Sequence, residues 1–249
     1  MLDRPLGRQQ PHPAVGMEEE VKKLILLLAI LLIVAGSGGC SRHPDFEETK
    51  NRTEQGNAVA QYRLGYSYYY GEGVAQDYKQ AAYWFQKAAV QGEAWAQFFL
   101  GECYYWGNGV SQNYRLAVYW HKKAAEEGLI VWSQYVLGTY YYNGNGVPKD
   151  HKQAFYWYQK AAEQGYVWAQ IALVDCYHYG TGVEIDYKQA YMWYIIAANL
   201  SDGNPHETGL ELHFNDLTPN MTKAQLAEGQ RLAYEWLEEF KARQNKQDK

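Results

Sequence analysis

The stretch that decides the fold runs from residue 64 to residue 92 and contains a pattern that the chain repeats four times. Its first copy reads Leu64-Gly65-x-x-Tyr68-x-x-Gly71-x-Gly73-Val74, then Ala81-x-x-Trp84, Ala88-Ala89 and Gly92. The tryptophans at the same place in the four copies are 36 or 37 residues apart: Trp84, Trp120, Trp157 and Trp193. A fixed period of this size is typical of stacked helical repeats.

Each copy by itself predicts two antiparallel helices. Leu64 and Tyr68 are four residues apart and mark one helix face, and Gly71 follows where a left-handed residue ends a helix. Asp77 can cap the second helix, with Gln80 at the capping-box position. Two helices joined by a short Gly-x-Gly loop form a hairpin, and one hairpin cannot bury its own apolar face. We therefore predict an all-α solenoid of four stacked hairpins.

Small residues alternate with large ones inside each predicted hairpin. Gly65 and Ala88 should let the helices approach closely around Trp84, and the same holds in the later copies. This assigns four of the nine tryptophans to the core.

The register of small, aromatic and glycine positions resembles the Sel-1-like repeat family, a relative of the tetratricopeptide repeats, from Gly56 to about Ala198. Val174 departs from the pattern, which has Gly at that position, and one extra residue lies between Leu129 and Trp132. The resemblance implies a right-handed alpha-alpha superhelix of about four hairpins with capping helices, which binds other proteins. It names no partner and implies no cofactor.

The repeats divide the chain into a leader, a tether, four hairpins and a C-terminal cap. We expect these boundaries: 1–40 signal peptide, 41–55 tether and N-terminal cap helix, 56–92, 93–128, 129–165 and 166–201 repeats, 202–241 loop and capping helix, 242–249 disordered tail. Thr218 or Thr222 can cap the last helix. Its Leu226, Leu232 and Trp236 should pack on the fourth repeat.

The leader has the features of a bacterial secretory signal, with Met17 as the expected translation start. The apolar run from Leu24 to Ala35 is too short to cross a bilayer at about 1.5 Å per residue. Ser37-Gly38-Gly39-Cys40 resembles a lipobox, which implies a diacylglycerol on Cys40. Ordinary signal cleavage near Gly39 is the alternative. We expect a lipid-anchored protein that faces the periplasm, on the outer membrane rather than the inner one.

Two further cysteines occupy one slot in the second and fourth repeats. Stacked helices lie about 10 Å apart, so Cys103 and Cys176 should be on the order of 20 Å apart. A disulfide needs Cα atoms within about 7 Å. We therefore predict two free thiols that pack as small buried residues.

One face of the predicted first helices is unusually aromatic. Helical spacing places eight residues on it: Trp95, Phe99, Glu102, Trp106, Trp132, Val136, Trp168 and Tyr179. The family resemblance implies that these helices line the concave side, so we interpret the face as a groove for a protein or peptide partner. Glu102 and Asp175 would favour basic groups on it. Two alternatives stay open: the tryptophans pack between helices, or they hold sugar rings of peptidoglycan.

The sequence gives little sign of catalysis. H-E-x-x-H, C-x-x-C, G-x-S-x-G and S-x-x-K are all absent, although some Sel-1-like proteins are linked to β-lactam hydrolysis. His206, Glu207, Glu211 and His213 form a loose cluster that we interpret as a helix end or loop rather than a metal site. A net charge of −5 does not suggest nucleic-acid binding. A non-catalytic scaffold without metal or cofactor is the favoured function, ahead of a glycan-binding or remodelling accessory and a hydrolase.

Overall fold

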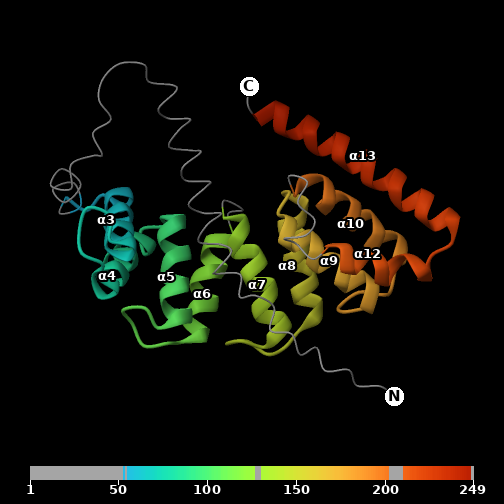
Figure 1. Cartoon of the computed structure of the whole chain (residues 1–249). Coiled ribbons are helices and arrows are strands. Elements are labelled where there is room, and N and C mark those ends of the chain that lie inside the picture. The colour runs from blue at the N-terminus through green and yellow to red at the C-terminus, as the bar shows by residue number, and fades with distance from the viewer. Residues whose placement is uncertain (1–52, 54, 127–129, 202–209, 248–249) are drawn as a thin grey trace. The chain divides into compact units, whose positions relative to one another are not determined.

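A computed structural model describes residue 53 and residues 55–126, 130–201 and 210–247 (Figure 1). The chain separates into two compact units at residue 45, and all described residues belong to the second unit. The predicted signal peptide, Cys40 and most of the predicted N-terminal cap helix lie outside the described residues. Within the described ranges the regular elements are helices and no strand occurs. None of these helices is both long and apolar enough to cross a membrane.

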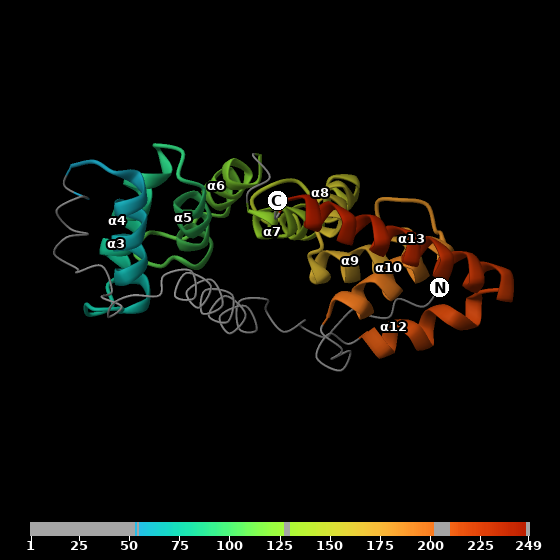
Figure 2. The same ribbon diagram turned by 90° about the horizontal axis from the view of Figure 1, so that it is seen from above.

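Eight of the helices form four consecutive hairpins, as predicted. Their bounds are α3 Ala58–Tyr70, α4 Tyr78–Ala89, α5 Ala94–Trp106, α6 Tyr114–Glu126, α7 Val131–Asn143, α8 His151–Glu163, α9 Val167–Tyr179 and α10 Tyr187–Leu200. The two helices of each hairpin contact each other, and each second helix also contacts the next first helix. Seen from above, α6 and α8 lie on one side of the stack and α5 and α7 on the other (Figure 2). The arrangement is the predicted all-α solenoid.

The helix ends carry the predicted caps, but the capping box predicted at Asp77 and Gln80 does not form, because the Asp77 N–H donates to the Tyr68 carbonyl (2.9 Å). Gly71 has φ 74° and its N–H donates to the Ser67 carbonyl, which ends α3 in the left-handed conformation. Asp77 accepts hydrogen bonds from the backbone N–H groups of Lys79 (2.9 Å) and Gln80 (3.1 Å) at the start of α4. The same caps recur in the later hairpins, with Asn113, Asp150 and Asp186 as the capping residues.

The second glycine of the Gly-x-Gly loop in the second, third and fourth repeats does more than make a turn. A Cβ atom at Gly109 would overlap the Tyr78 carbonyl at the start of α4, in the preceding hairpin. Gly146 and Gly182 lie in the same way against the starts of α6 and α8. At Gly73, in the first hairpin, nothing lies within 4 Å of such an atom. The loop glycines therefore also allow one hairpin to lie directly on the backbone of the one before it.

The glycine inside each first helix packs against a different residue than expected. A Cβ atom at Gly65 would lie 2.7 Å from the Phe85 ring, and Gly101 and Gly138 lie equally close to His121 and Tyr158. The ring over the glycine thus belongs to the residue after the repeat tryptophan. Trp84 and Trp120 are correspondingly only half-buried, and Trp157 and Trp193 are buried. The prediction that the helices close around the tryptophan itself is corrected.

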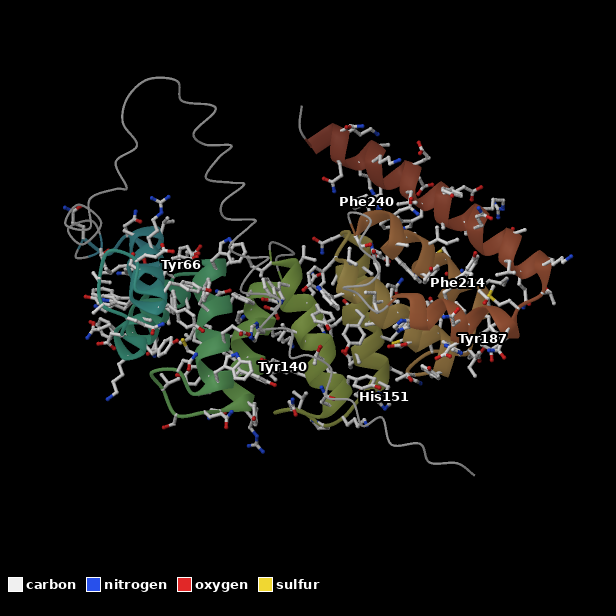
Figure 3. The ribbon with its side chains drawn as sticks, in the orientation of Figure 1. Tyr66, Tyr140, His151, Tyr187, Phe214 and Phe240 are labelled. Atoms are coloured by element: carbon white, nitrogen blue, oxygen red, sulfur yellow. The ribbon has the colours of Figure 1, made fainter. Side chains whose placement is uncertain are left out.

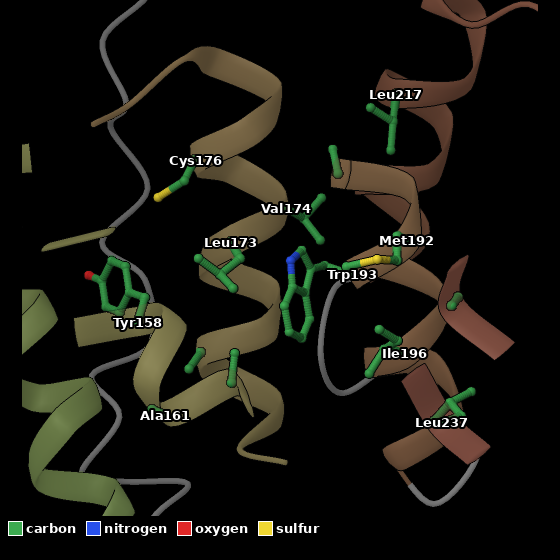
Figure 4. Packing of buried hydrophobic residues seen from close by; sticks show 14 of the residues in the cluster. Tyr158, Ala161, Leu173, Val174, Cys176, Met192, Trp193, Ile196, Leu217 and Leu237 are labelled. Atoms are coloured by element: carbon green, nitrogen blue, oxygen red, sulfur yellow. The ribbon is translucent and has the colours of Figure 1, made fainter. Parts of the chain in front are cut away.

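The fourth repeat shows why Val174 can replace the glycine. Val174 is fully buried and lies beside the Trp193 ring (Figure 4). The residue after this tryptophan, Tyr194, is only half-buried and lies 5.5 Å from the Phe214 ring of α12, measured between centroids. Because the Tyr194 ring packs against α12, the space beside position 174 can hold a valine side chain where the other repeats have Gly.

Buried glutamines tie each hairpin to the helix before it. The side-chain amide of Gln97 donates to the Ala89 carbonyl at the end of α4 (3.2 Å), and that of Gln170 donates to the Ala162 carbonyl at the end of α8 (3.2 Å). Gln61 and Gln134 make equivalent but longer bonds of 3.5 Å. These bonds satisfy carbonyls that a helix end leaves without a partner in its own helix.

The two cysteines are free and buried, as predicted. Cys103 and Cys176 belong to α5 and α9 and face the apolar core. Burial raises the pKa of the Cys176 thiol to about 12, and it raises the pKa of Cys103 further. Both side chains therefore act as small apolar residues.

The C-terminal cap is more helical than expected. Residues 210–217, assigned to a loop-like stretch, form helix α12 Leu210–Leu217, because Leu217 is fully buried in the core. A short 3₁₀ helix, η1 Thr218–Asn220, leads into α13 Lys223–Gln247. Thr222 caps α13 in a reciprocal capping box with Gln225. α13 also continues through residues 242–247, expected to be disordered, because this stretch contains no Gly or Pro.

Candidate functional site

Half of the predicted groove residues are exposed on the first helices. Trp95 and Trp106 of α5 and Trp168 of α9 are 38–39% exposed, and Tyr179 of α9 is 59% exposed. We call these four residues the aromatic surface. Scattered exposed apolar residues are normal, so these four large rings on two first helices are candidates for contact with a partner rather than proof of one.

Phe99 and Val136 do not belong to this surface. Phe99 is only 4% exposed, because Tyr66 of the preceding repeat (labelled in Figure 3) covers it. The Phe99 ring also stacks on Phe85, with 5.1 Å between the ring centroids. Val136 is 8% exposed and belongs to the core of the third repeat. The expected exposure of these two residues is corrected, because helical spacing places a residue on a face but does not show what the next repeat lays over it.

Trp132 takes an intermediate position. It is half-buried, and its ring lies 5.6 Å from Phe98 and 6.4 Å from Tyr166. Trp132 therefore links the second, third and fourth repeats by packing, which is the alternative that the sequence left open. It is not counted in the aromatic surface.

Glu102 connects the aromatic surface to the core. Its carboxylate accepts a hydrogen bond from the Trp106 indole N–H (3.1 Å) and lies 3.2 Å from Nε2 of the fully buried His121. The two atoms lie at ion-pair distance but make no hydrogen bond. The carboxylate is thus engaged on both sides and holds the Trp106 ring in place.

His121 also faces a serine, which raises the question of hydrolase chemistry. Nδ1 of His121 lies 3.5 Å from the Ser133 hydroxyl, so Ser133, His121 and Glu102 follow the order of a serine-hydrolase triad. Both Ser133 and His121 are 0% exposed. A substrate carbonyl cannot reach this hydroxyl while the helices are packed, so the three residues are a polar contact inside the core.

Asp175 is engaged as well. Its carboxylate lies 3.0 Å from Nε2 of His213, which joins α9 to α12. Both acidic residues that were expected to contact basic groups of a ligand thus have partners within the chain. Among the described residues no group of three possible metal ligands occurs. His206 and Glu207 of the loose cluster lie outside the described residues.

The sequence interpretation missed a second row of exposed rings. Tyr83, Tyr119 and Tyr156 precede the repeat tryptophans on α4, α6 and α8 and are 46–50% exposed. The signal was present in the sequence as a Tyr-Trp dipeptide in three of the four copies. It went unused because the dipeptide was assigned to the core through its tryptophan.

The stacked hairpins define a class of protein, the all-α solenoid of helical repeats. A family model described as Sel1 repeat matches residues 58–93, 96–129, 133–166 and 169–202, which together are more than half of the chain. The chain belongs to the Sel1 repeat family. Proteins of this family are generally protein-interaction scaffolds and are typically non-catalytic.

Two solved structures are similar to this chain. The first is a protective antigen present in uropathogenic Escherichia coli strains that displays an SLR fold: 38% identity, TM-score 0.71, covering 84% of this chain and 45% of that one. The second is a Sel1 repeat protein from Oxalobacter formigenes: 31% identity, TM-score 0.63, covering 78% and 75%. This chain therefore spans less than half the length of the first. A search of curated proteins finds no match.

Proposed function

We propose that this protein is a non-catalytic scaffold that binds a protein or peptide of the bacterial cell envelope through its aromatic surface. The observation that carries the proposal is the exposure of Trp95, Trp106, Trp168 and Tyr179 on the first helices of two repeats. Large aromatic side chains supply much of the binding energy at protein interfaces.

The Trp106 ring is suited to this role because it is already held in place. Its indole N–H donates to Glu102, which in turn lies against buried His121. A side chain that is ordered before binding loses less conformational freedom when a partner arrives. The three residues thus support a preformed anchor rather than one that must be ordered by the partner.

An affinity capture tests the proposal. The full chain and a Trp95→Ala/Trp106→Ala variant are used as baits against an envelope extract of the source cells. We expect a protein that the unmodified bait retains and the variant loses at least tenfold, since truncation of an interface aromatic costs about 2 kcal/mol or more. The matched control is Tyr234→Ala, which removes an exposed ring of α13. Equal retention by all three baits would show that the aromatic surface does not bind.

The envelope location rests on the leader. We propose that Cys40 carries a lipid that anchors the protein on the periplasmic side of the outer membrane, which the lipobox-like Ser37-Gly38-Gly39-Cys40 supports. Labelling with a radioactive fatty acid is expected to mark the unmodified chain, and Cys40→Ser is expected to be unlabelled and released from membranes. A serine variant that keeps label and membrane attachment would refute the anchor.

A further inference from the structure

Three of the second helices carry the same pattern of basic and aromatic side chains. In α4, α6 and α8 a basic residue, a tyrosine and a second basic residue follow one another at intervals of four. We call these nine residues the basic–tyrosine face: Lys79, Tyr83, Lys87, Arg115, Tyr119, Lys123, Lys152, Tyr156 and Lys160. Residues four apart share one helix face, so each set of three forms a stripe about 12 Å long.

All nine side chains are exposed to solvent. The ammonium of Lys87 lies over the Tyr83 ring, 4.8 Å from its centroid, and the ammonium of Lys160 lies 5.3 Å from the centroid of Tyr156. In the described part of the chain, only Lys123 among the six cations contacts a carboxylate, that of Glu126 at 3.4 Å. Two of the cations, Lys87 and Lys160, therefore rest on tyrosine rings, and five of the six have no carboxylate partner among the described residues.

The charge of these helices is opposite to that of the chain. The helices α4, α6 and α8 contain seven Lys and Arg residues and two Glu residues, although the whole chain has a net charge of −5. A local excess of positive charge in an acidic protein favours an acidic partner at that place and opposes a basic one.

The fourth repeat shows what this face of a second helix can receive. The positions equivalent to Tyr83 and Lys87 are Met192 and Ile196, and both are buried in a cluster with Ala233 and Leu237 of α13 (Figure 4). A helix of the chain itself thus packs on this face where its residues are apolar. In the first three repeats the same positions are exposed and are occupied by Tyr and Lys.

We propose that the basic–tyrosine face binds an acidic polypeptide segment of a partner protein. Carboxylates of the segment pair with the basic side chains, and the Tyr83 and Tyr156 rings hold the ammonium groups of Lys87 and Lys160 in place. Because lysines cover the Tyr83 and Tyr156 rings, stacking of sugars on these rings is disfavoured. This surface is separate from the aromatic surface of the first helices, so a scaffold with both can bind two proteins at once.

Fluorescence anisotropy with labelled poly-L-glutamate tests the proposal on the full chain. Lys87→Gln/Lys123→Gln/Lys160→Gln is expected to weaken binding at least tenfold, and Tyr83→Ala/Tyr119→Ala/Tyr156→Ala at least threefold with the charge unchanged. The matched control removes three exposed lysines of α13, Lys223→Gln/Lys241→Gln/Lys246→Gln, and is expected to change the affinity less than twofold. Circular dichroism checks that all variants keep their helices.

Three results would overturn the proposal. They are no binding of poly-L-glutamate, equal weakening by the α13 control, and tighter binding of polygalacturonate or of phosphatidylglycerol vesicles through the same residues. The first two results would show that the basic–tyrosine face does not bind acidic polypeptides. The third would assign this face to a glycan or a membrane. Each leaves the aromatic surface and its capture experiment unaffected, because the two tests change different residues.

Discussion

Gly109→Ala is expected to lower the free energy of unfolding by about 2–5 kcal/mol. Two terms contribute. The residue has φ 73°, where an L side chain is strained by about 1–2 kcal/mol. The new Cβ would also overlap the Tyr78 carbonyl, so backbone of two hairpins must separate, which adds about 1–3 kcal/mol. Urea denaturation followed by circular dichroism measures the change.

Gly73→Ala is the matched control for this substitution. Gly73 has nearly the same φ, 74°, in the same loop of the first repeat, but an added Cβ meets nothing within 4 Å. Only the strain of an L side chain at positive φ remains, so we expect the free energy of unfolding to fall by about 1–2 kcal/mol. Equal losses for the two variants would contradict the direct contact between each loop and the preceding hairpin.

The second large effect is expected at His121. His121→Ala removes a buried ring that packs on Gly101, and the Glu102 carboxylate keeps only its hydrogen bond from the Trp106 indole. Removal of a large buried ring, which leaves a cavity, costs about 3–5 kcal/mol. The third repeat provides a comparison, since it has Thr139 and Tyr158 at the positions of Glu102 and His121. Their hydroxyl oxygens lie 3.5 Å apart.

Introducing the Thr–Tyr pair of the third repeat into the second repeat separates the loss of the packed ring from the loss of the contact with the Glu102 carboxylate. The double variant Glu102→Thr/His121→Tyr fills the space and removes the mostly covered carboxylate, so we expect it to recover more than half of the stability lost in His121→Ala. Urea midpoints of both variants against the unmodified chain provide the measurement. A double variant as unstable as His121→Ala would show that the second repeat needs this histidine itself.

The sequence was sufficient for the features that lie within one repeat. The period of the tryptophans fixed four hairpins, Gly71 and its equivalents end the first helices, and Asp77 and its equivalents cap the second helices. Each of these depends on residues close together in the chain, where spacing and capping chemistry are direct guides. The buried thiols followed from the same register.

Contacts between repeats could not be obtained in this way. Phe99 occupies the same predicted face as Trp95, yet Tyr66 of the preceding repeat covers it. The overlap of Gly109 with Tyr78 likewise depends on how closely two hairpins stack, which a one-dimensional period does not contain. The partners of Glu102 and Asp175 also come from other helices, so neither could be read from its own helix.

The most direct test of the central claim is photo-crosslinking in living cells. A photoreactive benzoylphenylalanine is placed at Trp95, at Trp168, or at Tyr234 on α13, which is also exposed. If the aromatic surface binds a protein, positions 95 and 168 form a crosslink to the same partner and position 234 does not. A crosslink at position 234 with none at positions 95 and 168 would contradict the assignment of binding to the first helices.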